Sequence, residues 1–93
     1  MMNFGDLRTA TKKATLDMFE QMLQQKFMHQ SLCEGFDDTV KISCYELARC
    51  IAEKEDLSRN INMCDSFKNI LVGWLIDEGY SASLNENSII VKL

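Results

Sequence analysis

The sequence contains no proline, and its four glycines stand far apart. Without proline, collagen-like chains and proline-stiffened linkers are excluded, and long helices can run uninterrupted. Scattered glycines exclude a glycine-rich phosphate loop. Apolar runs are short, so we expect neither a secretory signal nor a membrane-spanning segment. The expected location is therefore the cytoplasm.

Positive charge is also scarce. Ten Lys and Arg oppose fourteen Asp and Glu, which leaves a net charge of -4. This balance excludes a generic basic binder of phosphate backbones. The charge is unevenly spread, because residues 1–31 sum to +1, residues 32–59 to -3 and residues 60–93 to -2. Since an acidic surface can imitate nucleic acid, a nucleic-acid-mimicking inhibitor is one alternative function.

Residues for catalysis or metal binding are few. The chain has one histidine, His29, which shares a helix face with Cys33 four positions later. The four cysteines have no closely spaced pair of the kind that binds zinc, so they are predicted to be reduced and buried. No third group completes a catalytic set around His29. We therefore predict no enzymatic activity, no metal and no cofactor.

The segment from about Phe4 to Leu32 predicts one long helix, because it is rich in good helix formers. At 100° per residue it carries two apolar stripes, which is more than a surface helix needs. One stripe contains Leu7, Ala10, Ala14, Met18 and Met22, and the other contains Leu16, Phe19, Leu23 and Phe27. The second stripe is either core or an interface with another molecule. The residues predicted for association are Leu16, Phe19, Met22, Leu23 and Phe27.

Shorter elements follow this helix. Residues 39–42 alternate and are mostly β-branched, which predicts a strand. Ser43 and Glu46 predict a capping box at the start of a helix that ends near Glu55. Asp65 or Ser66 is the expected cap of a third helix that ends before Gly79. The last fourteen residues predict a hairpin around Asn85-Glu86-Asn87.

This order of elements predicts a single α+β domain, with the long helix of residues 1–32 as a possible dimerisation element. Residues 39–93 resemble the winged-helix arrangement, in which a strand precedes the second helix and a hairpin forms the wing. The resemblance lies in element order and is carried by Val40–Ser43, Tyr45–Ala52 and the run 75–80 that enters the hairpin. A third strand from residues 40–42 would complete a three-stranded antiparallel sheet.

The winged-helix resemblance implies that the third helix enters the major groove of DNA, which requires Arg, Lys, Asn or Gln on its exposed side. Residues 60–93 hold four acidic and two basic residues, so the charge opposes this function. The main prediction is a non-catalytic regulatory or adaptor protein that binds another protein as a homodimer. The alternative is a nucleic-acid-binding regulator, for which the candidate residues are Arg8, Lys12, Lys13, Lys68 and Asn69.

Overall fold

A single long helix runs through the whole molecule. The computed structural model describes residues 1–58 and 60–93, and its first element is α1, Phe4–Glu34. Asn3 and Asp6 cap its start reciprocally: the Asp6 N–H donates to Asn3 Oδ1 at 2.9 Å, and the Asn3 N–H donates to Asp6 Oδ2 at 3.2 Å. Gly35 follows the helix with φ of 93°, a left-handed value that suits glycine. The predicted boundaries of this helix are confirmed to within two residues.

Three short strands form one antiparallel sheet. They are β1 (Thr39–Ser43), β2 (Ser81–Asn85) and β3 (Ser88–Lys92), in the spatial order β1-β3-β2. Val40 and Ile42 pair with Val91 and Ile89, and all four side chains are buried. Because side chains alternate along a strand, this register turns one face of the sheet entirely toward the core.

Two helices connect β1 to β2. They are α2 (Cys44–Lys54) and α3 (Asp65–Asp77). Ser43 caps α2 as predicted, since its hydroxyl accepts a hydrogen bond from the Glu46 N–H at 3.3 Å. The other half of the predicted box differs, because the Glu46 carboxylate instead pairs with Lys26 at 3.0 Å. The predicted cap of α3 is wrong by one residue: Cys64 holds the cap position and Asp65 is the first helical residue.

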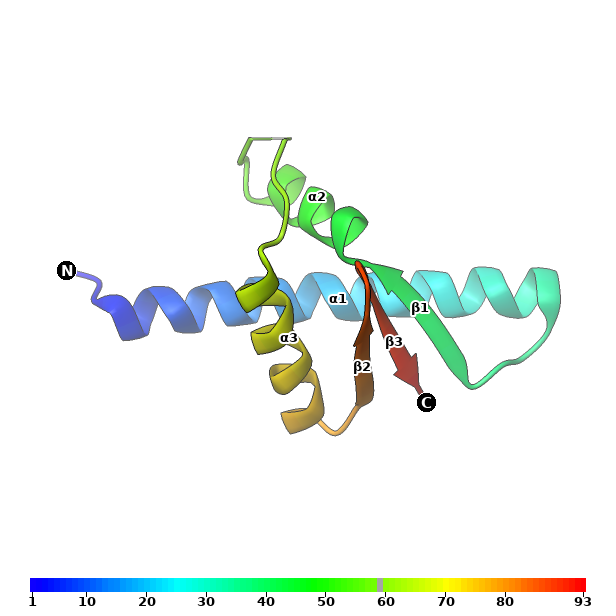
Figure 1. The fold of residues 1–93 in the computed structure, drawn as a ribbon. Helices are drawn as coiled ribbons and strands as arrows, with labels where there is room; N and C mark the ends of the chain where they lie inside the picture. The colour runs from blue at the N-terminus through cyan, green and yellow to red at the C-terminus, as the bar shows by residue number, and fades with distance from the viewer. Residues whose placement is uncertain (59) are drawn as a thin grey trace.

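The core forms along α1, which α2 and β1 contact directly, while α3 contacts mainly β2. Figure 1 shows α2 on one side of α1, α3 and the hairpin on the other, and both ends of α1 projecting beyond them. Phe19 is fully buried at the centre, where Tyr80 meets it edge-on with ring centroids 6.0 Å apart. Trp74 of α3 packs edge-on against Phe67 at 5.7 Å, and the Lys12 ammonium of α1 lies 5.9 Å from the Trp74 ring.

The predicted fold class is confirmed. The structure is α+β, with a long first helix followed by strand, helix, helix and hairpin, and this arrangement is compatible with a winged helix. The strand order matches the third strand expected from residues 40–42, which lies at one edge of the sheet beside β3.

Two neighbouring residues of α3 provide a matched test of this core. Leu75 is fully buried, whereas Ile76 is 54% exposed. We expect Leu75→Ala to lower the free energy of unfolding by about 2 to 5 kcal/mol, because it removes buried methyl groups and leaves a cavity. Ile76→Ala should lower it by less than about 1 kcal/mol. Urea unfolding followed by circular dichroism measures both, and equal losses would contradict the described packing of α3.

Candidate interaction surfaces

The apolar stripe predicted for association lies inside the chain. Phe19 is fully buried, and Met22 and Leu23 are only 6% and 8% exposed. Leu16 and Phe27 are half-buried and pack against the same core. Of the two alternatives left open by the sequence, the structure favours the core: Phe19, Met22 and Leu23 belong to it, and Leu16 and Phe27 pack at its edge. An association surface has to be sought elsewhere on the molecule.

The solvent side of α3 is one such surface. We name it the α3 face and define it by the residues of α3 that are exposed, which are Asp65, Ser66, Asn69, Ile70, Gly73, Ile76 and Asp77. None of them is basic and two are acidic. Glu78 and Glu86 are also exposed, one directly after α3 and one in the hairpin turn. The surface that a winged-helix protein turns toward DNA is thus apolar and acidic here.

Gly73 lies at the centre of the α3 face. Glycine inside a helix costs roughly 0.5 to 1 kcal/mol relative to alanine. A Cβ atom added at this position would meet nothing within 4 Å, so the packing of this chain does not require glycine there. Its neighbours on the face, Ile70 and Ile76, are 37% and 54% exposed. A flat, partly apolar strip without side-chain bulk at its centre lets another backbone approach closely.

The five residues predicted for nucleic-acid binding do not form one basic patch. Lys68 has a side chain only 13% exposed, and its ammonium lies 3.4 Å from the Asp65 carboxylate. The Lys12 ammonium lies over the Trp74 ring. Lys12 and Lys13 line a shallow hollow together with three carboxylates, those of Asp17, Glu20 and Glu78. Arg8 and Asn69 are exposed on α1 and α3 respectively. The positive charges are thus interleaved with negative ones.

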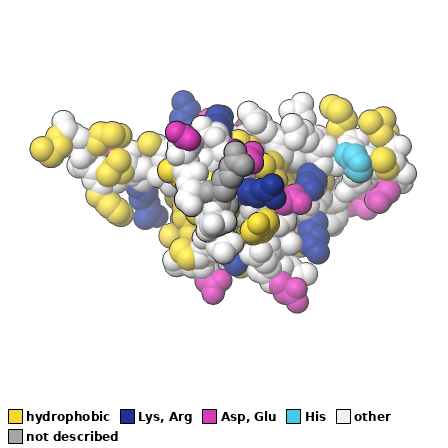
Figure 2. All heavy atoms as spheres, turned by 90° about the horizontal axis from the view of Figure 1, so that it is seen from above, with side chains coloured by type: hydrophobic (Ala, Val, Ile, Leu, Met, Phe, Trp, Pro, Cys, Tyr) yellow, Lys and Arg dark blue, Asp and Glu magenta, His cyan; other side chains and the backbone are white. Residues whose placement is uncertain are grey.

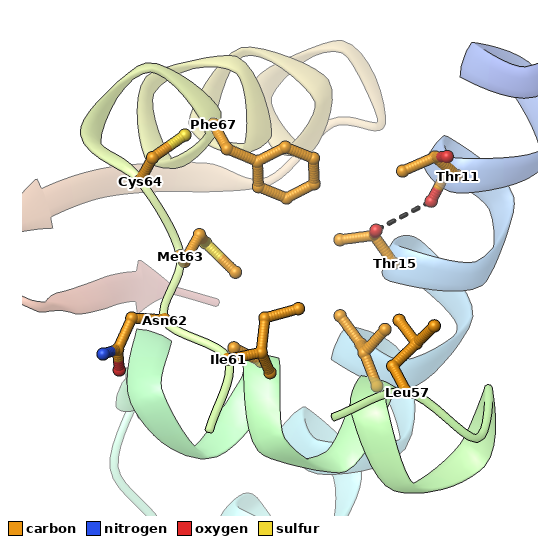
Figure 3. A pocket seen from close by; sticks show the side chains of 10 residues that line it. Thr11, Thr15, Leu57, Ile61, Asn62, Met63, Cys64 and Phe67 are labelled. Atoms are coloured by element: carbon orange, nitrogen blue, oxygen red, sulfur yellow. Dashed lines mark hydrogen bonds between the residues drawn. The ribbon is translucent and has the colours of Figure 1, made fainter. Parts of the chain in front are cut away.

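An apolar pocket lies between α1 and the segment that joins α2 to α3 (Figure 3). Its volume is about 290 Å³. Phe67, Met63 and Ile61 line one side of it, Thr11 and Thr15 of α1 face them, and Leu57 lies below Thr15 in this view. The Thr15 hydroxyl does not face the pocket as a free donor, because it donates to the Thr11 carbonyl at 2.7 Å. The lining therefore suits an apolar group and offers little to a polar one.

The first turns of α1 form a further apolar surface. Residues 1–11 are all exposed, and Phe4 and Leu7 are 76% and 54% exposed. Figure 2 shows hydrophobic side chains gathered on this projecting end of the molecule and again around the histidine at the opposite end. At that opposite end Met28, Leu32 and Phe36 are exposed. Exposed apolar patches of this kind often mark sites of interaction with other molecules, and α1 carries one at each end.

The ionisable thiols differ in environment, and the prediction that all four are buried is wrong for Cys33 and Cys64, which are exposed. Burial raises the pKa of the Cys44 thiol, an effect partly offset by the charge of Lys68. The exposed Cys64 has a lowered pKa, caused first by its hydrogen bond with the Ser66 hydroxyl at 3.2 Å and then by backbone N–H groups at the start of α3. His29 lies 3.9 Å from Cys33 Sγ near the far end of α1. It follows Thr15 of the pocket by fourteen residues, about 21 Å along the helix axis.

The thiol environments predict an order of reactivity. Cys64 should be alkylated by iodoacetamide much faster than Cys44 near neutral pH, since a lowered pKa and full exposure both favour the reactive thiolate. Ser66→Ala should slow the alkylation of Cys64 several-fold at neutral pH. The difference in rate between the parent and this variant should vanish well above the ordinary thiol pKa of about 8.5. Mass spectrometry of the cysteine peptides measures each rate. Equal rates in the parent and the variant would contradict the proposed role of the Ser66 hydroxyl.

Within residues 1–58 and 60–93, no three His, Cys, Asp or Glu side chains gather as a metal site would require. None of the described helices has the length and apolar character needed to cross a bilayer. Helical periodicity predicted most of the buried side of α3, but it placed Ile70, which is 37% exposed, in the core. The pocket could not be read from the sequence, since it depends on how Leu57 and residues 61–64 lie relative to α1. Comparison with protein-family models, with curated proteins and with solved structures gave no match.

Proposed function

We propose that this chain is a small non-catalytic regulatory or adaptor protein, and that it binds another protein through the α3 face while itself forming a homodimer. The observation that carries the proposal is the composition of that face. Its seven exposed residues include two isoleucines and a glycine but no lysine or arginine. DNA recognition depends on basic and amide side chains, whereas protein interfaces have an apolar centre and a polar rim.

The charge around the α3 face indicates the chemistry of the partner. Asp77 on this face and Glu78 directly after it are exposed, while the ammonium of Lys68 is largely covered and paired with Asp65. Complementary charge raises the rate and specificity of association. The partner surface that fits best has an apolar strip flanked by Lys or Arg. A helix is the most suitable element, because Gly73 allows a second backbone to lie close against α3.

A nucleic-acid-binding regulator is less well supported. Of its candidate residues, Lys68 is paired, Lys12 lies on an aromatic ring, and Lys13 shares a hollow with carboxylates. A nucleic-acid mimic would need a larger and more regular array of carboxylates than the α3 face offers, since a duplex carries one charge per about 1.7 Å of axis.

The proposal is tested with a pair of substitutions on the α3 face. We expect the tagged chain to retain a bound protein during purification from its native cells, and Ile70→Lys with Ile76→Lys to lose that protein. Both side chains are exposed, so the fold should be unaffected, which circular dichroism checks. Leu32→Lys with Met28→Lys, at the far end of α1, is the matched control and should retain the partner.

A nucleic-acid assay accompanies the capture. Fluorescence anisotropy with labelled duplex and single-stranded DNA, at about 50 mM salt, should show no binding by the parent chain. Micromolar binding that weakens steeply with salt would support the nucleic-acid alternative instead. Capture of the same protein by the parent and by the α3 variants would contradict the assignment of the α3 face. Capture of a nucleic-acid enzyme that polynucleotide displaces would favour the mimic.

A further inference from the structure

We propose that two copies of this chain associate through the start of α1, packed antiparallel, so that Phe4 and Leu7 of each copy lie beside Thr11 and Ala14 of the other. We name residues Phe4–Thr11 the α1 arm. The inference rests on the homodimer in the proposed function and names its interface. It uses a surface separate from the α3 face, so the two assignments can fail independently.

The α1 arm is the uncovered part of a face that is buried further along the same helix. At 100° per residue, Phe4, Leu7, Thr11, Thr15 and Met18 fall on one side of α1. Thr15 and Met18 are only 1% and 8% exposed, because the rest of the chain packs on them. Phe4 and Leu7 continue that face beyond the point where this packing ends. Figure 1 shows this end of α1 projecting past α2 and α3.

The groove that receives the arm lies one to two turns along the same helix. Ala10, Thr11 and Ala14 have small side chains, and they line a hollow of about 310 Å³ that adjoins the pocket of Figure 3. The rest of its lining is Thr15, Ile51, Glu55 and Leu57. Phe4 cannot fill this hollow in its own chain. The helix is continuous, so Phe4 stays about 10 Å along the axis from Thr11. The bulky side chains of the α1 arm can therefore reach this hollow only when the two belong to different copies of the chain.

Side-chain size selects the antiparallel orientation. With the two helices centred near Thr9, Phe4 lies level with Ala14 of the partner subunit and Leu7 lies level with Thr11 of the partner subunit. A parallel pair would instead set Phe4 on Phe4 and Leu7 on Leu7, which leaves the small side chains of Thr11 and Ala14 without a bulky partner. An antiparallel pair with twofold symmetry also closes on itself, which gives dimers and not fibres.

Sedimentation equilibrium at about 10 to 200 µM tests the interface, since self-association depends on concentration. The parent chain should move from its monomer mass of 10.7 kDa toward twice that mass. Phe4→Gln with Leu7→Gln should weaken self-association about tenfold or more and leave the circular dichroism spectrum unchanged, because both side chains are exposed. Met28→Gln with Leu32→Gln removes two exposed apolar residues from the other end of α1 and should leave self-association as in the parent.

Three results would overturn the proposal. They are a parent chain that stays monomeric throughout the range, a Phe4→Gln and Leu7→Gln variant that associates like the parent, and a control at Met28 and Leu32 that abolishes association. None of them bears on capture by the α3 face, so this interface can fail while the proposed partner site stands. Conversely, an intact dimer that captures no protein would leave the α1 arm in place and remove the α3 face.

Orientation is tested by cross-linking in a background of Cys33→Ser and Cys64→Ser, which removes the two exposed cysteines. Copies with Leu7→Cys, mixed with copies carrying Thr11→Cys, should form disulfide-linked heterodimers on mild oxidation, because the two positions lie level in the antiparallel pair. Efficient cross-linking among Leu7→Cys copies alone would identify a parallel pair and overturn the proposed packing.

Discussion

The burial of one face of α1 is the constraint on which the rest of the structure depends. Phe19 lies at the centre of that face without exposure to water, and the sheet, α2 and α3 each cover part of it. A small domain buries a smaller fraction of its surface on folding than a large one does. A continuous helix that several elements share helps to gather the buried side chains into one core. Helix α1 contacts α2 and β1 directly, whereas α3 contacts mainly β2 and meets α1 through the shared core. The sheet therefore takes part in positioning the α3 face.

Local patterns in the sequence explain why most elements could be predicted. The capping serine at residue 43, the glycine after α3 and the β-branched alternation in β1 and β3 are short-range signals whose physics lies within a few residues. The cap of α3 was misplaced because Asp65 and Ser66 have better capping side chains than Cys64, yet Cys64 takes the position. The start of that helix has no side-chain cap hydrogen bond, so capping propensity does not identify its first residue.

Periodicity also revealed two apolar stripes on α1, but it could not tell which parts of them meet the rest of the chain. The stripe with Phe19 and Leu23 is core, and the uncovered apolar residues are Phe4 and Leu7 at one end and Met28 and Leu32 at the other. Their exposure depends on where α2 and α3 cross α1, which is a property of the fold as a whole. The same holds for Lys68, whose spacing suggested a free basic side chain although its ammonium is mostly covered.

The position of β3 at the centre of the sheet shapes the order in which this protein can fold. β1 pairs with β3 and not with β2, which is nearer in the sequence. Ile42 therefore pairs with Ile89, about half the chain length later. During synthesis the three helices can form from local contacts while β1 has no strand beside it. Pairing over such a distance raises the loop-closure entropy and slows folding. Until the hairpin emerges, β1 has no strand to pair with, and an unpaired strand edge favours association with other chains.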